Sequence, residues 1–370
     1  MKPTVFLTGA TGFLGMEVLA RLLEAGDRHV LALVRASDAT AADQRLDDVL
    51  ATLWDDPAPY RERVSAVRGD VTQPGLGLGT RWAEVAEASQ AVVHCAASIS
   101  FDLPLPEARA INVDGTARVL DFAVEAQARG GLERFLHVST AYVSGRHEGA
   151  FAERQLDTGQ TFRNTYEQTK ADAEQIVALA RELRPAIARP SIVMGESDSG
   201  WTPAFNVLYW PMRAFSRGLF EELPALPGGR VDVVPVDYVA DGLVHLLDSR
   251  EAGVFNLVAG EDAPTVDELT TLASEYFGRP RPPFVDPIDP DSTDGDGDHG
   301  AVFVPYFDMR VVFDDARARS LLVPAGIQAP PLREYFGRLM DYAEAARWGK
   351  TRITREAARA QAQAAALTAT

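Results

Sequence analysis

The sequence predicts an α/β protein built on a doubly wound parallel sheet, with a smaller, mostly carboxy-terminal lobe. Short apolar runs rich in β-branched residues alternate with Ala/Leu-rich helical stretches over the first 200 residues, an alternation typical of parallel sheets with helices on both faces. The runs are continuously apolar rather than alternating, as expected of strands buried on both faces. They are TVFLTG, HVLALVR, VSAVRGD, AVVHCAA, RFLHVST and AIARPSIVMG.

The pattern changes after residue 200. The stretch 201–220 is rich in aromatic residues, whereas VDVVPVDYVADGLVHLL at 231–247 has the pattern of one more strand and helix of the sheet. We therefore expect a cofactor-binding domain at 1–200 and 231–262, a substrate-binding lobe at 201–230 and 263–346, and a basic, alanine-rich helical tail at 347–370.

Composition limits the function classes. The chain has 370 residues, 46% of them hydrophobic, and a formal charge of −17, which argues against a nucleic-acid partner. Its single cysteine, Cys95, excludes an internal disulfide, and the sequence contains no apolar run of the roughly 20 residues that a transmembrane segment needs. The amino terminus lacks the pattern of a secretory signal, so we expect a cytoplasmic protein. The acidic stretch 285–300 lacks the glutamate that closes a calcium loop, so no metal site is expected.

The first run ends in the motif TGATGFLG, in which three glycines are spaced three residues apart. A strand that enters a helix through such a turn presents backbone N–H groups to a pyrophosphate, which is the arrangement of a Rossmann-type dinucleotide site. The predicted ligands in this turn are Thr8, Gly9, Thr11, Gly12, Phe13, Leu14 and Gly15.

The end of the second run predicts which dinucleotide is bound. NAD-specific sites place an acidic residue there, but this chain has Arg35, whose guanidinium suits a 2′-phosphate. We therefore expect NADPH. Asp70, followed by Val71, is placed to accept from the adenine amine, and Ala96, Ala97 and Ser98 supply small residues where the backbone passes close to the cofactor.

The chemistry is predicted by YEQTK, in which Tyr166 and Lys170 share one helix face. An ammonium beside a phenol lowers the pKa of the phenol, so we expect Tyr166 to be a proton donor with a lowered pKa. Thr140, at a hydroxyl-rich strand end, can hydrogen-bond a substrate carbonyl oxygen. Together the two hydroxyls would stabilise negative charge that develops on that oxygen.

The glycine turn, the Tyr-x-x-x-Lys pair and the upstream hydroxyl together resemble an extended short-chain dehydrogenase/reductase. Longer strings resemble the fatty acyl-CoA reductase and thioester reductase group, a male sterility-type NAD(P)-binding family: GDVTQPGLGL, VVHCAASISFDLPLPEARAINVDGT, HVSTAYVSG, RPSIVMGESDSGWT and VVPVDYVAD. The resemblance covers most of residues 4–260. It implies NADPH-dependent reduction of an acyl thioester to an aldehyde, with onward reduction to an alcohol left open.

The resemblance also implies roles for single residues. The catalytic hydroxyl would be Thr140 rather than Ser139, and Asn112 would support the active-site lysine. Beside the nicotinamide would lie Pro190, Ser191, Ile192 and Val193. The additional domains of many relatives do not occur in this sequence, so we expect acyl-CoA or an acyl-carrier protein to be supplied in trans. The residues make no prediction of oligomeric state.

Two other function classes stay open. Sugar-nucleotide epimerases and dehydratases share the glycine turn and the Tyr–Lys pair, as do other extended alcohol dehydrogenases, but an NAD-retaining epimerase is disfavoured by Arg35. A non-catalytic NADPH sensor would be expected to lose Tyr166 or Lys170, and both are present.

The substrate contacts are predicted to be Ser100 and three aromatic residues, Trp201, Phe205 and Phe215. The apolar bulk of this stretch suits an acyl chain better than a polyol, although each residue could instead belong to the core. The tail after residue 343 carries five basic residues against two glutamates. It is either a solvated helix or a segment that attracts CoA phosphates or an acidic carrier protein.

Overall fold

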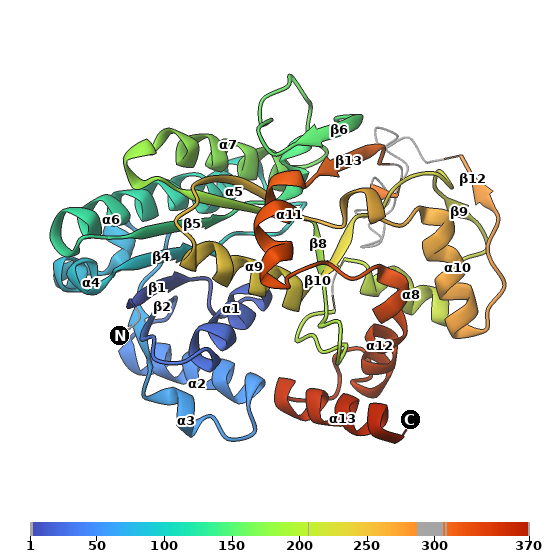
Figure 1. The fold of residues 1–370 in the computed structure, drawn as a ribbon, viewed down its shortest axis with the longest axis horizontal. Coiled ribbons are helices and arrows are strands. Elements are labelled where there is room, and N and C mark those ends of the chain that lie inside the picture. Colours follow the sequence, from blue (N-terminus) through green and yellow to red (C-terminus); the bar gives the residue numbers. More distant parts are fainter. Residues whose placement is uncertain (1–2, 206, 287–305, 308, 369–370) are drawn as a thin grey trace.

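The computed structural model describes residues 3–205, 207–286, 306–307 and 309–368. Its centre is a seven-stranded parallel sheet with the strand order β11-β7-β5-β4-β1-β2-β3, which confirms the predicted α/β class (Figure 1). Its strands are β1 (Val5–Thr8), β2 (Val30–Val34), β3 (Val64–Arg68), β4 (Ala91–His94), β5 (Arg134–Val138), β7 (Ala186–Pro190) and β11 (Gly253–Leu257).

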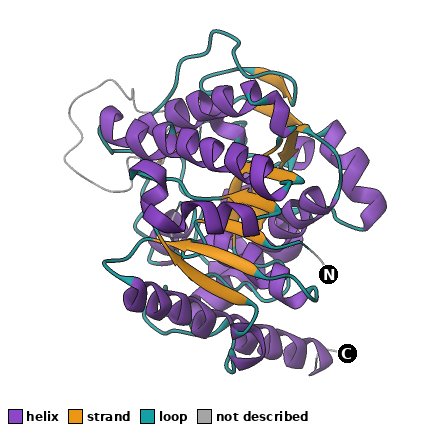
Figure 2. Ribbon diagram, turned by 90° about the vertical axis from the view of Figure 1, so that its left-hand side faces the viewer, coloured by secondary structure: helices purple, strands orange, loops and turns teal. Residues whose placement is uncertain are grey.

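Both faces of the sheet are covered by helices, which is why its strands are continuously apolar (Figures 1 and 2). In β1, Val5 and Leu7 enter a core that they share with α1, α2 and α9, whereas Phe6 points to the opposite face and joins a core with α4, α6 and α7. These helices are α1 (Phe13–Glu24), α2 (Ala39–Leu53), α4 (Trp82–Ala88), α6 (Asp114–Gly130), α7 (Thr165–Leu179) and α9 (Val236–Asp248), together with the shorter α3 (Ala58–Arg61) and α5 (Leu105–Asn112).

The strand order reverses at β1, which has β2 on one side and β4 on the other. In open parallel sheets, ligands bind outside the carboxyl ends of the strands at such a switch point. The glycine turn after β1 and the small residues after β4 both lie at this place, so the topology positions them to form one site.

The lobe contains three further two-stranded pairs, each parallel, and a core of its own. The pairs are β6 (Gly149–Ala152) with β13 (Val311–Asp314), β8 (Ile192–Met194) with β10 (Val233–Pro235), and β9 (Leu223–Pro224) with β12 (Phe284–Val285). Its helices are α8 (Tyr209–Ser216), α10 (Val266–Phe277) and α12 (Leu332–Ala345), whereas α11 (Ala316–Leu322) packs on β11 and adds Ala318 and Leu322 to the core of the central sheet.

The two predicted domains are closely joined. Strand β6 lies inside the range expected for the cofactor domain, yet it pairs with β13, far along the chain. Helix α12 also packs on both sides, because Tyr335 belongs to the lobe core and Tyr342 to the core that contains β1. The domain boundaries therefore stay a prediction. Most of the acidic stretch expected as a surface loop, 287–305, lies outside the described residues.

The last helix, α13 (Arg355–Thr368), follows an unusual turn. Arg347, Trp348 and Gly349 all have positive φ, at 51°, 55° and 88°. After this turn, α13 lies below α12 and beside α2, which it contacts (Figure 1).

Candidate active site

The glycine turn after β1 has the backbone geometry of a phosphate-binding loop. Gly9 has a φ of +80°, and a Cβ on it would lie 2.7 Å from the backbone nitrogen of Ala96. A Cβ on Gly15 would lie 2.1 Å from the carbonyl oxygen of Gly9. A side chain at either position would therefore break the turn or push β1 and β4 apart.

The start of α1 remains available to an anion. Its N-cap, Gly12, makes no side-chain capping bond, and the first turn of the helix contains no acidic residue. A Cβ on Gly12 would meet only the Gly9 carbonyl oxygen, at 3.4 Å, so the other side of this position is open. Uncapped N–H groups at a helix start suit a pyrophosphate.

The neighbouring predicted residues surround this turn. Thr11 is exposed at its tip, and Phe13 and Leu14 are half-buried. The Thr8 hydroxyl accepts a hydrogen bond from the backbone N–H of Ala96 at 3.1 Å and bonds to Nδ1 of His94 at 2.8 Å. Thr8 thus ties the carboxyl ends of β1 and β4 together.

Three arginines gather around the turn between β2 and α2. Arg35 is exposed at the end of β2. Arg45 donates to the Arg35 carbonyl oxygen at 2.5 Å, and Nε of Arg68 donates to the carbonyl oxygens of Ala36 and Ser37 at 3.3 and 3.1 Å. The acidic residue of this turn, Asp38, is occupied as the N-cap of α2 and accepts from the backbone N–H of Ala41. Sequence reasoning missed Arg45 and Arg68, although Arg68 could have been found within the third apolar run, VSAVRGD, just before Asp70.

The remaining predicted cofactor residues lie along the same edge. Asp70 is half-buried and accepts from the backbone and hydroxyl of Thr72, both at 2.8 Å, while Val71 is buried. The segment Ala96–Ser98 is half-buried beside the glycine turn.

The side chain of Asn112 hydrogen-bonds to the segment Ala96–Ser98. Its Nδ2 donates to the Ser98 carbonyl oxygen at 3.1 Å and to the Thr169 hydroxyl at 3.0 Å, and its Oδ1 accepts from the Ser98 N–H at 2.8 Å. The direct contacts of Asn112 thus position Ser98 and join it to α7.

The structure brings the three predicted catalytic residues together. The Thr140 hydroxyl lies close enough to the phenol of Tyr166 to lower its pKa. It donates to the carbonyl oxygen of Pro190 at 3.4 Å and accepts from the backbone N–H of Tyr142 at 3.3 Å. Lys170 is 3% exposed, and its Nζ donates to the carbonyl oxygen of Val138 at 2.8 Å. Ser139 points elsewhere and donates to Glu174 at 2.6 Å.

The expected lowering of the Tyr166 pKa is wrong for this structure. Burial raises the pKa of Tyr166 to about 12, although the neighbouring Thr140 hydroxyl lowers it. Burial also lowers the pKa of Lys170 to about 8, against the opposing effect of the Glu174 carboxylate. The reason is that desolvation of both groups dominates and that the Lys170 ammonium bonds to a backbone carbonyl instead. At neutral pH the phenol of Tyr166 is therefore protonated and able to donate.

The segment predicted to lie beside the nicotinamide runs from the end of β7 into β8. Pro190, Ser191 and Ile192 are buried and Val193 is half-buried. Pro190 contacts one of the predicted catalytic residues directly, because its carbonyl oxygen accepts from the Thr140 hydroxyl.

The predicted substrate residues lie in different settings. The Ser100 hydroxyl donates to Asp102. Trp201 is fully buried, and its Nε1 donates to the carbonyl oxygen of Ile353 at 3.1 Å, so in this structure it is a core residue rather than a substrate contact. Phe215 is 6% exposed and packs near Phe220 and Phe277.

Phe205 is half-buried. Its ring stacks on Tyr342 with centroids 6.1 Å apart and lies against Gly349, where a Cβ would meet it at 3.0 Å. The aromatic stretch thus contributes largely to packing, and a substrate role remains a prediction for Phe205 and Phe215.

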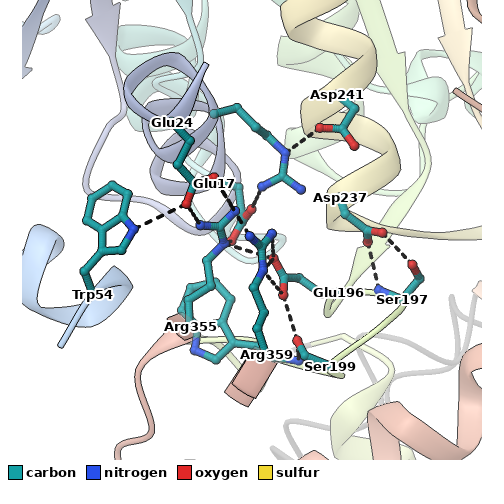
Figure 3. Close-up of polar contacts among 12 residues, drawn as sticks. Glu17, Glu24, Trp54, Glu196, Ser197, Ser199, Asp237, Asp241, Arg355 and Arg359 are labelled. Carbon is teal, nitrogen blue, oxygen red and sulfur yellow. Dashed lines mark hydrogen bonds and ion pairs between the residues drawn. The ribbon is translucent and has the colours of Figure 1, made fainter. Parts of the chain in front are cut away.

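The most buried arginine of the carboxy-terminal tail, Arg355, is neither exposed to solvent nor free to bind a phosphate. Arg355 is 1% exposed and forms ion pairs with Glu17 and Glu196, both at 2.9 Å, and with Glu24 at 2.6 Å. Arg359 pairs with Glu196 at 2.5 Å (Figure 3). We call these five residues the tail cluster. The sequence predicts that the tail is either a solvated helix or a phosphate-attracting segment, and both expectations are wrong at Arg355. Its guanidinium instead neutralises the buried carboxylates of Glu17, on α1, and Glu196, after β8.

Within the described ranges, no group of three or more His, Cys, Asp or Glu side chains could hold a metal ion. Over the same ranges, the helices are too short or too polar to span a bilayer.

Comparison with known families and proteins supports the resemblance. The model of the male sterility protein family matches residues 7–243. A component of the linear gramicidin synthase of Brevibacillus parabrevis is 28% identical over 94% of this chain, and fatty acyl-CoA reductase 1 of Pongo abelii is 32% identical over 64%. The chain spans 7% of the first protein and about half, 53%, of the second.

Solved structures agree in fold. The terminal R domain of the myxalamid PKS-NRPS biosynthetic pathway has a TM-score of 0.79 at 24% identity, covering 94% of this chain and 91% of that one. UDP-glucuronic acid 4-epimerase from Bacillus cereus, solved with NAD, has a TM-score of 0.66 at 17% identity, covering 94% and 98%. At such identities the likeness concerns the fold alone. The family model matches residues 7–243, more than half of the chain, so the chain belongs to the male sterility protein family of NAD-binding domains.

Proposed function

We propose that the protein is an NADPH-dependent reductase of acyl thioesters, which forms an aldehyde; onward reduction to an alcohol is an outcome that the test below distinguishes. The observation that carries this proposal is that the Thr140 hydroxyl lies next to the phenol of Tyr166, on the helix that also carries the buried Lys170. The names of the relatives supply the substrate class, since they include fatty acyl-CoA reductases and an L-2-aminoadipate reductase.

NADPH fits the residues of the glycine turn. The uncapped start of α1 would hold the pyrophosphate, and Arg35 with Arg68 would hold the 2′-phosphate. When bound, the cofactor supplies the hydride that the thioester carbonyl carbon accepts. The guanidinium groups around β2, rather than a carboxylate available to ribose hydroxyls, favour NADPH over NADH.

The chain's own residues act on the carbonyl oxygen. Thr140 and Tyr166 would donate hydrogen bonds to it as negative charge develops, and such a donor is typically worth about 10²- to 10³-fold in rate. Tyr166 then provides the proton, since its phenol is protonated at neutral pH. Collapse of the resulting hemithioacetal breaks the carbon–sulfur bond, releasing the thiol and the aldehyde. Overall, thioester, NADPH and one proton give aldehyde, thiol and NADP⁺.

The thiol is proposed to belong to CoA or to a carrier protein. One structural neighbour, with a TM-score of 0.74 at 21% identity, is a thiolation-reductase di-domain from an archaeal non-ribosomal peptide synthetase. That neighbour makes a carrier-bound acyl group the first alternative to a free acyl-CoA.

The test is incubation of the purified chain with NADPH or NADH and a panel of acyl-CoAs, acyl-carrier proteins and nucleotide sugars, with reduction products resolved as aldehyde or alcohol. We expect NADPH-dependent aldehyde formation in the parent and its loss in Tyr166→Phe. Reaction only with nucleotide sugars, with tightly retained NAD⁺, would establish the epimerase class instead. Absence of reduction with CoA and carrier-bound substrates alike would refute the proposal.

The same panel tests the acyl chain. Each methylene buried in an apolar channel contributes about 0.8 kcal/mol, so we expect kcat/KM to rise from short to longer chains. Phe205→Ser or Phe215→Ser should flatten that rise and leave short substrates active. If kcat/KM of the parent does not change with acyl chain length, Phe205 and Phe215 are residues of the core and not substrate contacts.

A further inference from the structure

A buried carboxylate, Glu174, lies directly behind the catalytic residues. It is on α7 one turn after Lys170 and is 1% exposed. Nε of Arg189 donates to both of its oxygens at 3.0 Å, and Nη2 of Arg189 donates to Oε1 at 2.5 Å. The Ser139 hydroxyl donates to Oε2 at 2.6 Å. We call Ser139, Glu174 and Arg189 the inner cluster.

Each member of the inner cluster adjoins a different part of the active site. Glu174 shares α7 with the Tyr–Lys pair. Ser139 directly precedes Thr140, after β5, and Arg189 directly precedes Pro190, at the end of β7. The Glu174 carboxylate is therefore the point at which all three catalytic segments are bonded together.

Stability alone does not account for this arrangement. Arg189 is fully buried, and taking a guanidinium and a carboxylate out of water costs free energy that their attraction only roughly repays. An apolar pair of similar volume would hold the same segments together at comparable stability. What the ion pair adds is direction, since a guanidinium and a hydroxyl each fix the orientation of the carboxylate that they bond.

We propose that Glu174 is a positioning residue for the reaction: its carboxylate holds Thr140 and the Tyr–Lys helix in register and supplies the negative charge that faces Lys170. This inference rests on the proposed function for its activity readout but not for its charge readout.

The electrostatic surroundings of Lys170 support the second part. Burial raises the pKa of Cys95 to about 12 and lowers that of His94 to about 3 and that of His137 well below its usual range, so these neighbours are neutral near pH 7. Of the groups that act on Lys170, Glu174 is the one that carries charge, and it raises the pKa of the ammonium. Removing that charge should lower the Lys170 pKa.

The composition of the chain allows this to be measured without any substrate. It contains three lysines, Lys2, Lys170 and Lys350. In a protein labelled with ¹⁵N and ¹³C only in lysine, NMR titration of the side-chain signals reports each pKa separately, and single Lys2→Arg and Lys350→Arg variants assign them. We expect Glu174→Gln to shift the Lys170 titration to lower pH, with Lys350 unchanged.

The same variant is assayed with NADPH and an acyl-CoA. We expect kcat at least tenfold below the parent, KM within about twofold, and an alkaline limb of the kcat profile displaced to lower pH. Glu153→Gln is the matched control, since Glu153 is a buried carboxylate that bonds the backbone N–H groups of Asn256, Arg317 and Ala318. It should reduce stability without moving the Lys170 titration.

A Glu174→Gln protein with the parent's kcat and the parent's Lys170 titration would overturn the proposal. If that variant does not fold, Ser139→Ala is assayed in its place, because it removes one hydrogen bond to Glu174 and leaves the ion pair between Glu174 and Arg189. A kcat about threefold or more below the parent supports the proposal, and an unchanged kcat refutes it. If the parent reduces no thioester, the proposed function fails, while the titration of Lys170 still tests this one.

Discussion

Two buried groups of arginines and carboxylates hold this protein together, and they differ in how far they reach along the chain. The inner cluster joins Glu174 to Arg189, only 15 residues apart. The tail cluster joins Arg355 to Glu24, 331 residues apart. The first lies behind the proposed catalytic hydroxyls and is proposed to fix their geometry. The second joins Arg355, on α13, to α1, the first helix after β1 (Figure 3).

The two clusters also differ in charge balance. The inner cluster pairs one carboxylate with one guanidinium, whereas the tail cluster contains three carboxylates and two guanidinium groups. The pKa values of two of its carboxylates, Glu17 and Glu196, shift in opposite directions. Burial raises the pKa of Glu17 to about 7 despite Arg21, whereas Arg359 and Arg355 outweigh burial at Glu196 and lower its pKa. We therefore expect variants near the inner cluster to change turnover and variants of the tail cluster to change stability.

The largest effect is expected at the catalytic pair. Tyr166→Phe removes the proton donor and should lower kcat by about 10²- to 10³-fold, with NADPH affinity nearly intact. Lys170→Ala should harm both turnover and cofactor binding. Steady-state kinetics and NADPH titration separate the two outcomes, and Tyr60→Phe, on α3, is the control. Near-normal turnover of Tyr166→Phe at pH 7 would refute its role.

The tail cluster should dominate stability. Arg355→Met leaves Glu17 and Glu196 buried without one of their cations, and breaking a buried ion pair in this way costs about 3–5 kcal/mol. The free energy of unfolding from urea titration measures the loss. Arg333→Met, on the exposed side of α12, is the matched control and should lie within about 0.5 kcal/mol of the parent. Equal losses in both variants would mean that the tail is not fastened by this cluster.

A smaller effect is expected at the cofactor site. Arg35→Asp should weaken NADPH binding at least tenfold, about 1.4 kcal/mol, because the guanidinium is replaced by a group that repels the 2′-phosphate. NADH binding should change much less. Fluorescence titration measures the dissociation constants of both cofactors. Equal losses of NADPH and NADH affinity in Arg35→Asp would contradict a role of Arg35 in NADPH specificity.

The Glu17 carboxyl makes the tail cluster sensitive to pH. Its folded-state pKa lies above the value of about 4.5 that it has when unfolded, so its ionisation costs stability progressively as pH rises from about 4.5 to about 7. Glutamine cannot ionise. Glu17→Gln should therefore gain stability relative to the parent across this window, as measured by urea titration at pH 4.5, 6 and 7.5. Glu133→Gln reports the effect of removing an exposed carboxylate, and parallel curves for parent and Glu17→Gln would contradict the assignment.

The contrast between near and distant contacts also explains what sequence could predict. The sheet, the glycine turn and the Tyr–Lys helix depend on local patterns, such as the three glycines around Gly12 and the four-residue spacing before Lys170. Arg355 and Trp201 depend on partners far along the chain, so no local pattern distinguishes them from a solvated arginine or a substrate contact. The same holds for the pairing of β6 with β13. The pKa of Tyr166 was missed because desolvation depends on the packed surroundings.

The basic residues of the tail that stay outside the cluster should have the smallest effect. Arg347 and Lys350 are exposed and flank Gly349, which lies against Phe205. If Phe205 borders the acyl site, these two charges stand near the path of an acyl-CoA or an acidic carrier protein. Arg347→Gln combined with Lys350→Gln should raise KM about twofold at low salt and leave kcat and stability unchanged.

Salt separates this attraction from a packing effect. The Debye length falls from about 30 Å at 0.01 M to about 3 Å at 1 M, so the difference in KM between parent and double variant should vanish as salt rises. Truncation after Trp348 is not equivalent, because it also removes Arg355 and with it the tail cluster. Arg333→Gln, which keeps the turn intact, is the control for a general change in surface charge. Equal KM values for parent and double variant at low salt would assign Arg347 and Lys350 to the solvated surface and leave the tail a purely structural fastening.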